Sequence, residues 1–486
     1  MNTYIGMDLG TSGLKMLLVT ADGSILAENT QTYPVSYPNP GWSEQNPEDW
    51  FAAALRGLEQ LLAGQDKSKV RGISFGGQMH GLVALDGSDN VIRPAILWND
   101  GRTEEETQYL NEVIGKEKLS AWTGNIAFAG FTAPKLLWVK RHEIENFAKI
   151  AKIMLPKDYL VYRLSGAFST DFSDASGMLL LDVKNRRWSR EMCDVCGISE
   201  QMLPELHESY EVVGMLKQEI ADKFGLKDVK IIAGAGDNAA AAVGTGVVGE
   251  GGCNISLGTS GTLFVSSASY KEDKVNALHS FCHADGGWHL MGCILSAASC
   301  NSWWVNGILQ STDYKKEEDG LDDFLGKNDV CFLPYLMGER SPHNDVTARG
   351  AFIGMRPDTT RKIMTLAMLE GVTFALRDCL EAAKKNGAGI PRTKLCGGGA
   401  KSKLWRKIVA NVMNLPVDIP QTEQGPGFGA AMLAMVGCGE YISVQQAADA
   451  IVRIKETVLP DPEIAAQYEK RYHHFTKLYP ALKGLF

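Results

Sequence analysis

The chain has 486 residues, of which 45% are hydrophobic and 22% are charged, and its formal net charge is −8 at pH 7. This composition is typical of a soluble globular protein, and the length predicts about two large domains. The negative charge argues against nonspecific binding to nucleic acid or membrane surfaces, so we expect neither as a partner. The sequence shows neither a signal peptide nor an apolar run long enough to span a membrane. We therefore expect a cytoplasmic protein.

The first predicted element is a β-hairpin whose turn is rich in glycine, over residues 8–13. Apolar runs precede and follow this turn, as expected for two paired strands. Such a turn leaves backbone N–H groups free to bind a phosphate, and Asp8 adds a carboxylate that a hydrated divalent cation could bridge to it. The candidate phosphate-binding residues are Gly10, Thr11, Ser12, Gly13 and, just beyond the turn, Lys15.

An α/β pattern follows the hairpin. We expect a third strand near residues 25–34 and then a helix, with Asn46 as N-cap and Pro47 as its first residue. The next strand, residues 70–75, ends in two glycines, and in open α/β folds ligands bind at this end of the strands. Gln78 and His80 follow there as candidate binding groups, although a loop histidine is more often simply solvated or capped.

Residues 96–102 repeat this arrangement of a strand followed by hydrogen-bonding groups. Trp98 offers an apolar face, while Asn99 and Asp100 offer amide and carboxylate partners, which is the combination that a polyol requires. Asp100 is also suited to cap the helix that begins near Arg102, and both roles are compatible. Farther along, the polar residues 170–177 predict a loop that lines part of a cleft.

Asp237 stands where a buried strand, residues 229–233, gives way to an alanine-rich helix. Glycines at 234 and 236 permit close approach of a ligand. The carboxylate is suited to cap the helix, and it is equally suited to act as a general base for a bound hydroxyl group. Position alone does not decide between these two roles.

The pentapeptide Leu-Gly-Thr-Ser-Gly occurs twice, at residues 9–13 and 257–261. An internal repeat of this kind predicts two related halves, each presenting a glycine-rich hairpin to one shared phosphate group. We place the boundary after Gly246 and expect domains at residues 1–246 and 247–486, with a hinge near the boundary. A third glycine-rich transition, residues 395–402, leads into a helix, and its N–H groups could face a nucleotide.

One histidine pattern and one cysteine pattern resemble metal-binding motifs, but we predict a metal site at neither. His279, His283 and His289 flank a glycine-containing turn, so we expect a hairpin there and no metal site. Cys193 and Cys196 form a lone CxxC without the second pair that a zinc site needs, and we interpret the spacing as incidental.

Taken together, these motifs resemble the FGGY family of carbohydrate kinases along essentially the full length of the chain. The matching segments are residues 8–13, 131–138, 236–238, 256–261, 338–354 and 397–402. The resemblance implies an α/β fold of two ribonuclease-H-like domains, the actin-like ATPase fold, flanking a deep catalytic cleft. Within the family, residues 77–81 resemble the substrate-side tract of xylulose kinases, whereas Asn238 replaces the glutamine of glycerol kinases.

The resemblance implies transfer of the γ-phosphoryl group of ATP to the C5 hydroxyl of D-xylulose, with Mg²⁺. Asp237 would be the general base, and Asp8 would organise the Mg²⁺ through water. The implied sugar-side residues are Gln78, Met79, His80, Trp98, Asn99, Asp100 and Asn238. The implied nucleotide-side residues are Gly10 to Gly13 and Lys15, the second hairpin with Gly258, Thr259 and Ser260, and an adenosine pocket with Gly398, Gly399 and Ser402.

Two alternatives to this function stay open at this point. One is a kinase for another ketose or polyol, such as ribulose, gluconate or an autoinducer sugar. The other is a non-catalytic protein, either an ATP-dependent sugar sensor or an actin-like chaperone ATPase. The partners we expect are the sugar and ATP, and a homodimer is a candidate assembly.

Overall fold

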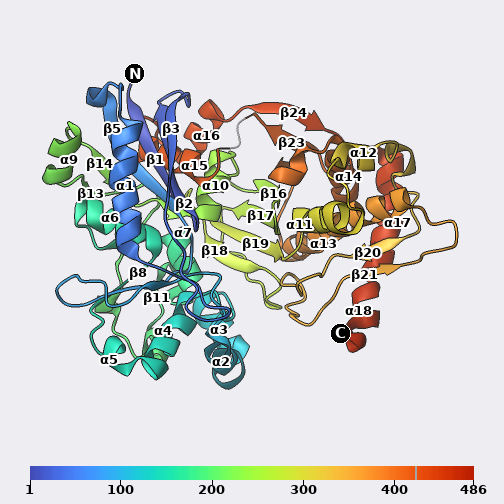
Figure 1. The fold of residues 1–486 in the computed structure, drawn as a ribbon, viewed down its shortest axis with the longest axis horizontal. Helices are drawn as coiled ribbons and strands as arrows, with labels where there is room; N and C mark the ends of the chain where they lie inside the picture. The colour runs from blue at the N-terminus through green and yellow to red at the C-terminus, as the bar shows by residue number, and fades with distance from the viewer. Residues whose placement is uncertain (422–423) are drawn as a thin grey trace.

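The computed structural model describes residues 1–421 and 424–486 as two α/β lobes that lie side by side, each built around a seven-stranded sheet (Figure 1). The first lobe contains the N-terminus and the second contains the C-terminus. The predicted α/β class and the presence of two sheet-containing lobes are confirmed.

The first sheet has the strand order β13-β14-β5-β1-β2-β3, and β15 also pairs with β5. β1, β2 and β3 form an antiparallel meander, as predicted, and β5 lies parallel to β1 with β14 parallel to β5. The strand bounds are Thr3–Leu9 for β1, Gly13–Thr20 for β2, Ile25–Thr32 for β3, Val70–Gly77 for β5, Val212–Met215 for β13, Lys230–Ile232 for β14 and Ala235–Gly236 for β15.

The second sheet repeats this arrangement in the order β18-β19-β17-β16-β22-β23-β24. Its meander is β16, β17 and β19, and β22 and β23 extend it in parallel, so β16 and β17 correspond to β1 and β2. The repeated pentapeptide therefore marks equivalent hairpins, as predicted. The strand bounds are Cys253–Leu257 for β16, Gly261–Ser267 for β17, His279–Cys282 for β18, Trp288–Ile294 for β19, Thr393–Cys396 for β22, Val417–Pro420 for β23 and Ile454–Val458 for β24.

Helices cover both sheets and begin where the sequence predicts. Helix α1 (Pro47–Leu61) starts at Asn46, whose side chain accepts a hydrogen bond from the Glu48 N–H. The side chains of Trp50 and Leu58 on this helix are fully buried. The other long helices are α6 (Pro156–Ser165), α10 (Asp237–Gly244), α13 (Arg361–Lys385), α14 (Lys403–Met413), α15 (Pro426–Gly437) and α17 (Pro462–Phe475).

Helix α15 connects the two halves of the sequence, because it packs on β1, β5 and α10 of the first lobe. The approach is so close that a Cβ atom at Gly6 would lie 1.8 Å from the Gly427 carbonyl oxygen, so only glycine fits there. The second half of the chain thus returns to the first lobe. The domain limits 1–246 and 247–486 stay a prediction.

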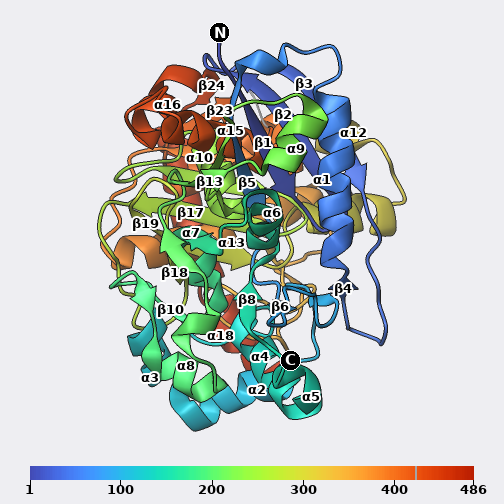
Figure 2. The same cartoon turned by 90° about the vertical axis from the view of Figure 1, so that its left-hand side faces the viewer.

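A smaller group of elements lies below the first sheet, at the bottom of Figure 2. Cys193 and Cys196 are buried in helix α8 as free thiols. The group comprises α2 (Glu104–Gln108), a π-helix (Tyr109–Gly115), α3 (Lys116–Thr123), α4 (Thr132–His142), α5 (Ile144–Phe147), β8 (Lys152–Met154), β10 (Leu181–Asp182), β11 (Arg187–Trp188) and α8 (Arg190–Cys196).

The predicted loop at residues 170–177 is wrong. This segment contains the end of strand β9 (Ser169–Asp171), helix α7 (Phe172–Ala175) and a 3-10 turn (Ser176–Met178), and nearly all of it is buried. The polar side chains of this segment are buried inside the lobe, where the buried ammonium group of Lys157 takes the place of solvent as their charged partner.

The second half of the chain also contains α11 (Ala298–Ser302), a π-helix (Trp303–Ile308), α12 (Tyr314–Glu318), β20 (Cys331–Leu333), β21 (Ala351–Ile353) and α18 (Leu478–Leu482). Helix α16 (Val444–Ile451) packs against α15 and the core of the first lobe. None of the helices in the described residues combines the length and the apolar character needed to cross a membrane.

Candidate active site

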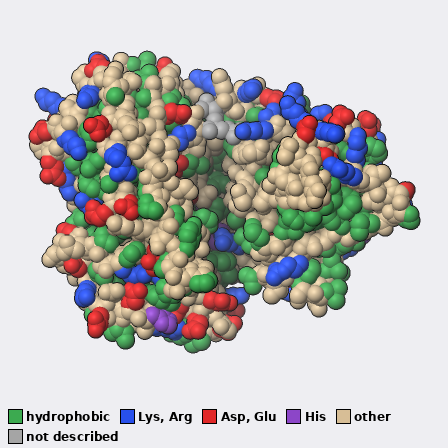
Figure 3. Space-filling view, viewed as in Figure 1, with side chains coloured by type: hydrophobic (Ala, Val, Ile, Leu, Met, Phe, Trp, Pro, Cys, Tyr) green, Lys and Arg blue, Asp and Glu red, His purple; other side chains and the backbone are tan. Residues whose placement is uncertain are grey.

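The two glycine-rich hairpins face the space between the lobes. Figure 3 shows a hollow there, with basic side chains visible inside it. A pocket of about 270 Å³ is lined from both sides, by Asn238 and Thr245 of the α10 region and by Ser256 and Thr262 of the second hairpin. Helix α10 and the strands of the second hairpin therefore line one pocket between the lobes.

The first turn is held closed by its own backbone. The N–H of Gly10 donates to the Gly13 carbonyl at 3.0 Å, and the Tyr33 hydroxyl donates to the Gly10 carbonyl at 2.5 Å. Lys15 donates to Gln424 Oε1 at 2.7 Å, and its charge lowers the pKa of Asp8, its partner in the strand pairing. The phosphate-binding roles of residues 10–13 and of Lys15 stay predictions.

Asp8 and Asp237 place two carboxylates close together on the first-lobe side. Burial and the charge of Asp237 raise the pKa of Asp8 to about 7, and burial raises the pKa of Asp237 to about 6. The N-cap of α10 is Gly236, and the Asp237 carboxylate accepts a hydrogen bond only from its neighbour, the Asn238 N–H, at 2.7 Å. Asp237 is therefore not the N-cap of α10, and its role as general base stays a prediction.

The phosphate turn and the predicted sugar side meet at Thr11. Trp98 Nε1–H donates to Thr11 Oγ1 at 2.9 Å, and Thr11 Oγ1–H donates to Gln78 Oε1 at 3.2 Å. The Gln78 amide also donates to Gln45 Oε1 at 3.1 Å and is almost fully buried. Gln78 is thus part of the scaffold behind the turn, whereas Trp98 is about half exposed.

His80 has a strained backbone, with φ at 70°, and this conformation is fixed from two sides. Its carbonyl accepts hydrogen bonds from Thr132 Oγ1 at 3.0 Å and from Lys135 Nζ at 2.9 Å. Its Nδ1 lies 2.8 Å from the Gly177 carbonyl, so Nδ1 carries the proton and Nε2 is an acceptor. Burial lowers the pKa of His80 to about 3, which keeps the ring neutral.

Met79 and Asn238 connect the sugar side to the candidate base. Met79 is buried beneath Gly236, where an added Cβ atom would lie 3.0 Å from three atoms of the methionine side chain. The Asn238 amide nitrogen lies 4.0 Å from Met79 Sδ. The two predicted sugar residues Met79 and His80 therefore lie at the same end of the cleft as Asp237.

Asp100 does not cap helix α2 as the sequence suggested, because that helix begins at Glu104 with Thr103 as its N-cap. Its side chain is fully buried, and its two oxygens accept hydrogen bonds from Ser43 N–H and from the backbone and guanidinium of Arg102. Asn99 is exposed on the surface. Contact of Asn99 or Asp100 with a sugar stays a prediction.

The second turn is anchored to helix α11. The Thr259 carbonyl accepts hydrogen bonds from Ala297 N–H and Ser299 Oγ–H, at 2.9 and 2.7 Å. A surface pocket of about 690 Å³ brings this turn together with Gly398 and the half-exposed Trp303, which the sequence did not suggest. A tryptophan face beside glycine backbone is well suited to an adenine ring.

The predicted adenosine residues have different surroundings. Gly398 is exposed, whereas Gly399 is buried, and an added Cβ atom there would lie 2.8 Å from Leu257 Cβ. Ser402 caps helix α14 through the Trp405 N–H and donates to Glu318 Oε2 at 2.7 Å. Nucleotide contacts by Gly399 and Ser402 stay predictions.

Arg340 is a second residue that sequence reasoning missed. Its guanidinium carbon lies 5.5 Å from the centre of the Phe128 ring of the first lobe, and its charge contributes to the lowered pKa of His80. Within the described residues, no hydrogen bond or ion pair involves its guanidinium group. A free cation therefore lies across the cleft from the predicted sugar side.

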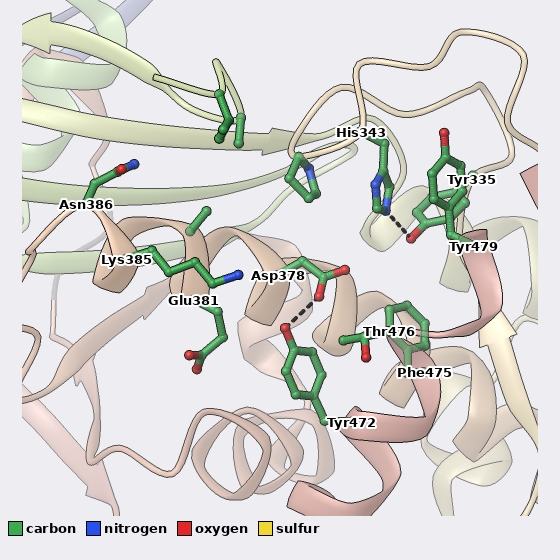
Figure 4. A pocket seen from close by; sticks show the side chains of 14 residues that line it. Tyr335, His343, Asp378, Glu381, Lys385, Asn386, Tyr472, Phe475, Thr476 and Tyr479 are labelled. Atoms are coloured by element: carbon green, nitrogen blue, oxygen red, sulfur yellow. Dashed lines mark hydrogen bonds between the residues drawn. The ribbon is translucent and has the colours of Figure 1, made fainter. Parts of the chain in front are cut away.

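The loop that carries Arg340 is supported from behind. Glu339 Oε1 accepts hydrogen bonds from Leu295 N–H and Arg340 N–H, at 3.0 and 2.7 Å. Figure 4 shows the pocket at the back of the loop, about 320 Å³ in volume, in which His343 stacks on Tyr479 and Tyr472 donates to Asp378. The guanidinium is thus presented on a rigid support.

Asp8 offers a site that suits a hydrated divalent cation but cannot hold one alone. The described residues contain no group of three or more His, Cys, Asp or Glu side chains able to hold a metal ion. Its carboxylate accepts no hydrogen bond from another described residue, and its pKa is raised mainly by burial and further by the charge of Asp237, while Lys15 lowers it. One or two carboxylates, together with phosphate oxygens and water, are the usual Mg²⁺ ligands.

Comparison with family models gives two matches that together span most of the chain. Residues 3–244 match the N-terminal domain of the FGGY family of carbohydrate kinases, and residues 253–438 match the C-terminal domain of that family. The xylulose kinase of Escherichia coli is 40% identical over 486 residues, which cover 99% of each chain.

Solved structures agree in fold over the whole chain. A crystal structure described as a xyloylose kinase from Brucella ovis superposes with a TM-score of 0.95 at 40% identity and covers 100% of both chains. A gluconate kinase from Lactobacillus acidophilus superposes with a TM-score of 0.94 at 27% identity, covering 99% of this chain and 98% of its own.

Proposed function

Because the chain belongs to the FGGY family of carbohydrate kinases, we propose that it phosphorylates the C5 hydroxyl of D-xylulose, with Asp237 as general base. It is a sugar kinase, a phosphotransferase that uses ATP as its co-substrate. The full-length similarity to a xylulose kinase supports the choice of sugar. The observation that carries the mechanism is a partly buried carboxylate, Asp237, at the mouth of α10 between the sugar side and the glycine-rich turns.

Asp237 is suited to remove the proton from the attacking hydroxyl. Its pKa of about 6 leaves it mostly ionised at neutral pH and still basic enough to accept a proton. The Asn238 N–H fixes one carboxylate oxygen at 2.7 Å, which leaves the other for the hydroxyl. Phosphoryl transfer depends mainly on positioning and on stabilising charge, so a cleft that closes and excludes water supports this chemistry.

Asp8 is the residue that would hold Mg²⁺, through water. When bound, Mg²⁺ neutralises charge on the transferred phosphoryl group. In the protein, the turn N–H groups of residues 10–13 and of 258–260 would orient the phosphates. Trp303 and Gly398 would receive the adenine ring, because both line the pocket beside the second turn.

The sugar would bind between the neutral ring of His80 and the second lobe. His80 Nε2 would accept a hydrogen bond from a sugar hydroxyl, since Nδ1 is committed to the Gly177 carbonyl. Arg340 would donate to the end of the sugar that is farther from Asp237. The free guanidinium also favours a second candidate substrate, an aldonate such as gluconate, whose carboxylate would pair with Arg340.

The test is release of ADP from MgATP across D-xylulose, D-ribulose, gluconate, xylitol and glycerol. We expect the highest kcat/KM for D-xylulose. A higher kcat/KM for gluconate would transfer the substrate assignment to aldonates, and release that no sugar stimulates would contradict the kinase reaction. Cytoplasmic location and a homodimer stay predictions, and sedimentation of the purified chain would test the homodimer.

A further inference from the structure

A fully buried ionic cluster lies directly behind the candidate base. Lys157 Nζ is 2.7 Å from Asp158 Oδ1, 2.9 Å from Asp171 Oδ1 and 3.9 Å from Asp174 Oδ2. No side chain in this cluster is more than 1% exposed. Three carboxylates thus share one ammonium group away from water, an arrangement that is costly to bury.

One carboxylate of the cluster extends the network toward the cleft. Asp171 Oδ2 accepts hydrogen bonds from Ser173 Oγ–H at 2.5 Å, from the Ser173 N–H at 2.8 Å and from Ser209 Oγ–H at 2.7 Å. Lys157 holds the other oxygen of Asp171. The position of the Ser173 side chain is therefore determined by a carboxylate that is itself fixed.

Ser173 passes this constraint to the residue before the candidate base. Because its hydroxyl proton is donated to Asp171, its oxygen is free to accept, and it accepts the Gly236 N–H at 3.1 Å. Gly236 is the N-cap of α10 and Asp237 is the next residue. One ion pair and two hydrogen bonds thus connect Lys157, through Asp171 and Ser173, to the backbone N–H of Gly236, the residue before Asp237.

The same segment contacts the sugar side and the other lobe. The Gly177 carbonyl fixes His80 Nδ1, and an added Cβ atom at Gly177 would lie 2.4 Å from the His80 ring. Ser176 Oγ accepts the Cys282 N–H of the second lobe at 2.9 Å. Residues 171–177 therefore touch the elements that carry Asp237 and His80 at the point where the lobes meet.

We propose that Ser173, oriented by Asp171 and Lys157, is a positioning residue that sets the direction of the Asp237 carboxylate. The inference rests on the proposed function, in which Asp237 is the base. Ser173 does not touch the sugar or the nucleotide, because its side chain is buried. Its effect passes through the Gly236 peptide, and a displacement of about 1 Å at a reacting group costs on the order of a hundredfold in rate.

Ser173→Ala tests this proposal, with Ser209→Ala as the matched control. Each variant removes one hydroxyl hydrogen bond to the same oxygen of Asp171, but only Ser173→Ala leaves the Gly236 N–H without its acceptor. We expect Ser173→Ala to lower kcat about ten- to a hundredfold, with the KM values for sugar and ATP changed less than about threefold. Ser209→Ala should retain kcat within about twofold, with a similar loss of thermal stability.

Equal kcat values for the two variants would overturn the proposal. If Ser173→Ala does not fold, Ser173→Cys keeps the side-chain volume with a weaker acceptor and carries the same comparison. The Asp237→Asn variant, measured in the same assay, distinguishes a failure of the proposed base from a failure of the proposed positioning role. Normal turnover in Asp237→Asn would contradict the proposed base, whereas an inactive Asp237→Asn with a fully active Ser173→Ala would contradict only the positioning role.

Discussion

Replacing Asp237 by asparagine should stabilise the ligand-free protein at neutral and alkaline pH. Burial raises the pKa of this carboxyl from 3.8 to about 6, so the folded state holds the proton more tightly than the unfolded chain does. Above pH 6 the folded protein must bury a charge that the unfolded chain leaves in water, at a cost of up to about 3 kcal/mol. Partial exposure of the carboxylate lowers the expected gain to about 1 to 2 kcal/mol.

The sign of this effect depends on pH. The carboxyl is protonated in both states only well below the unfolded pKa of 3.8, so the advantage of Asp237→Asn should shrink to a small part of its pH 8 value at pH 4. Asp345→Asn is the control, because hydrogen bonds from Thr347 and Tyr479 lower the pKa of Asp345 to about 2, and its removal should destabilise the protein at pH 8.

The assay is urea unfolding of both variants and the parent protein at pH 4 and pH 8, without nucleotide or Mg²⁺. We expect the Asp237→Asn midpoint to exceed that of the parent protein at pH 8, and the difference to be much smaller at pH 4. Equal midpoints at pH 8 would refute the argument that the carboxylate is held in a desolvated position.

Three other substitutions test individual contacts of the cleft. His80→Ala should raise the sugar KM about five- to tenfold in steady-state assays, since a neutral hydrogen bond is lost; an unchanged KM would place the sugar elsewhere. Arg340→Met should raise the sugar KM about ten- to a hundredfold and leave the KM for ATP unchanged, and the reverse pattern would assign Arg340 to the nucleotide. Trp303→Ala should weaken ADP binding about tenfold by calorimetry, and equal affinity would exclude stacking on this ring.

Local sequence was sufficient to predict the hairpins and several helix starts. Asn46 does cap helix α1, because a capping side chain bonds to backbone groups only two or three residues away. The two turns could also be paired with each other, because the same pentapeptide occurs at 9–13 and 257–261. Such features depend on neighbours in the chain.

Contacts between distant segments were not predictable in this way. Arg340 packs against Phe128 and Trp303 lies beside the second turn. Arg340 belongs to the matching segment 338–354, but that match assigned it no role, and Trp303 belongs to no motif recognised in the sequence. The segment 170–177 has the composition of a solvated loop, yet Lys157 neutralises it from another helix and it becomes buried. A run of polar residues in the sequence predicts a solvent-exposed segment only when no side chain from a distant part of the chain pairs with it in the fold.

The most direct test of the account is the position of the transferred phosphoryl group and its dependence on Asp237. Phosphorus NMR would be recorded on the product formed from D-xylulose and MgATP by the parent protein and by Asp237→Asn. The account predicts phosphate on the C5 oxygen with the parent protein, and a rate about two to four orders of magnitude lower with Asp237→Asn at similar nucleotide affinity. Phosphate on another oxygen, or a comparable rate without the carboxylate, would contradict it.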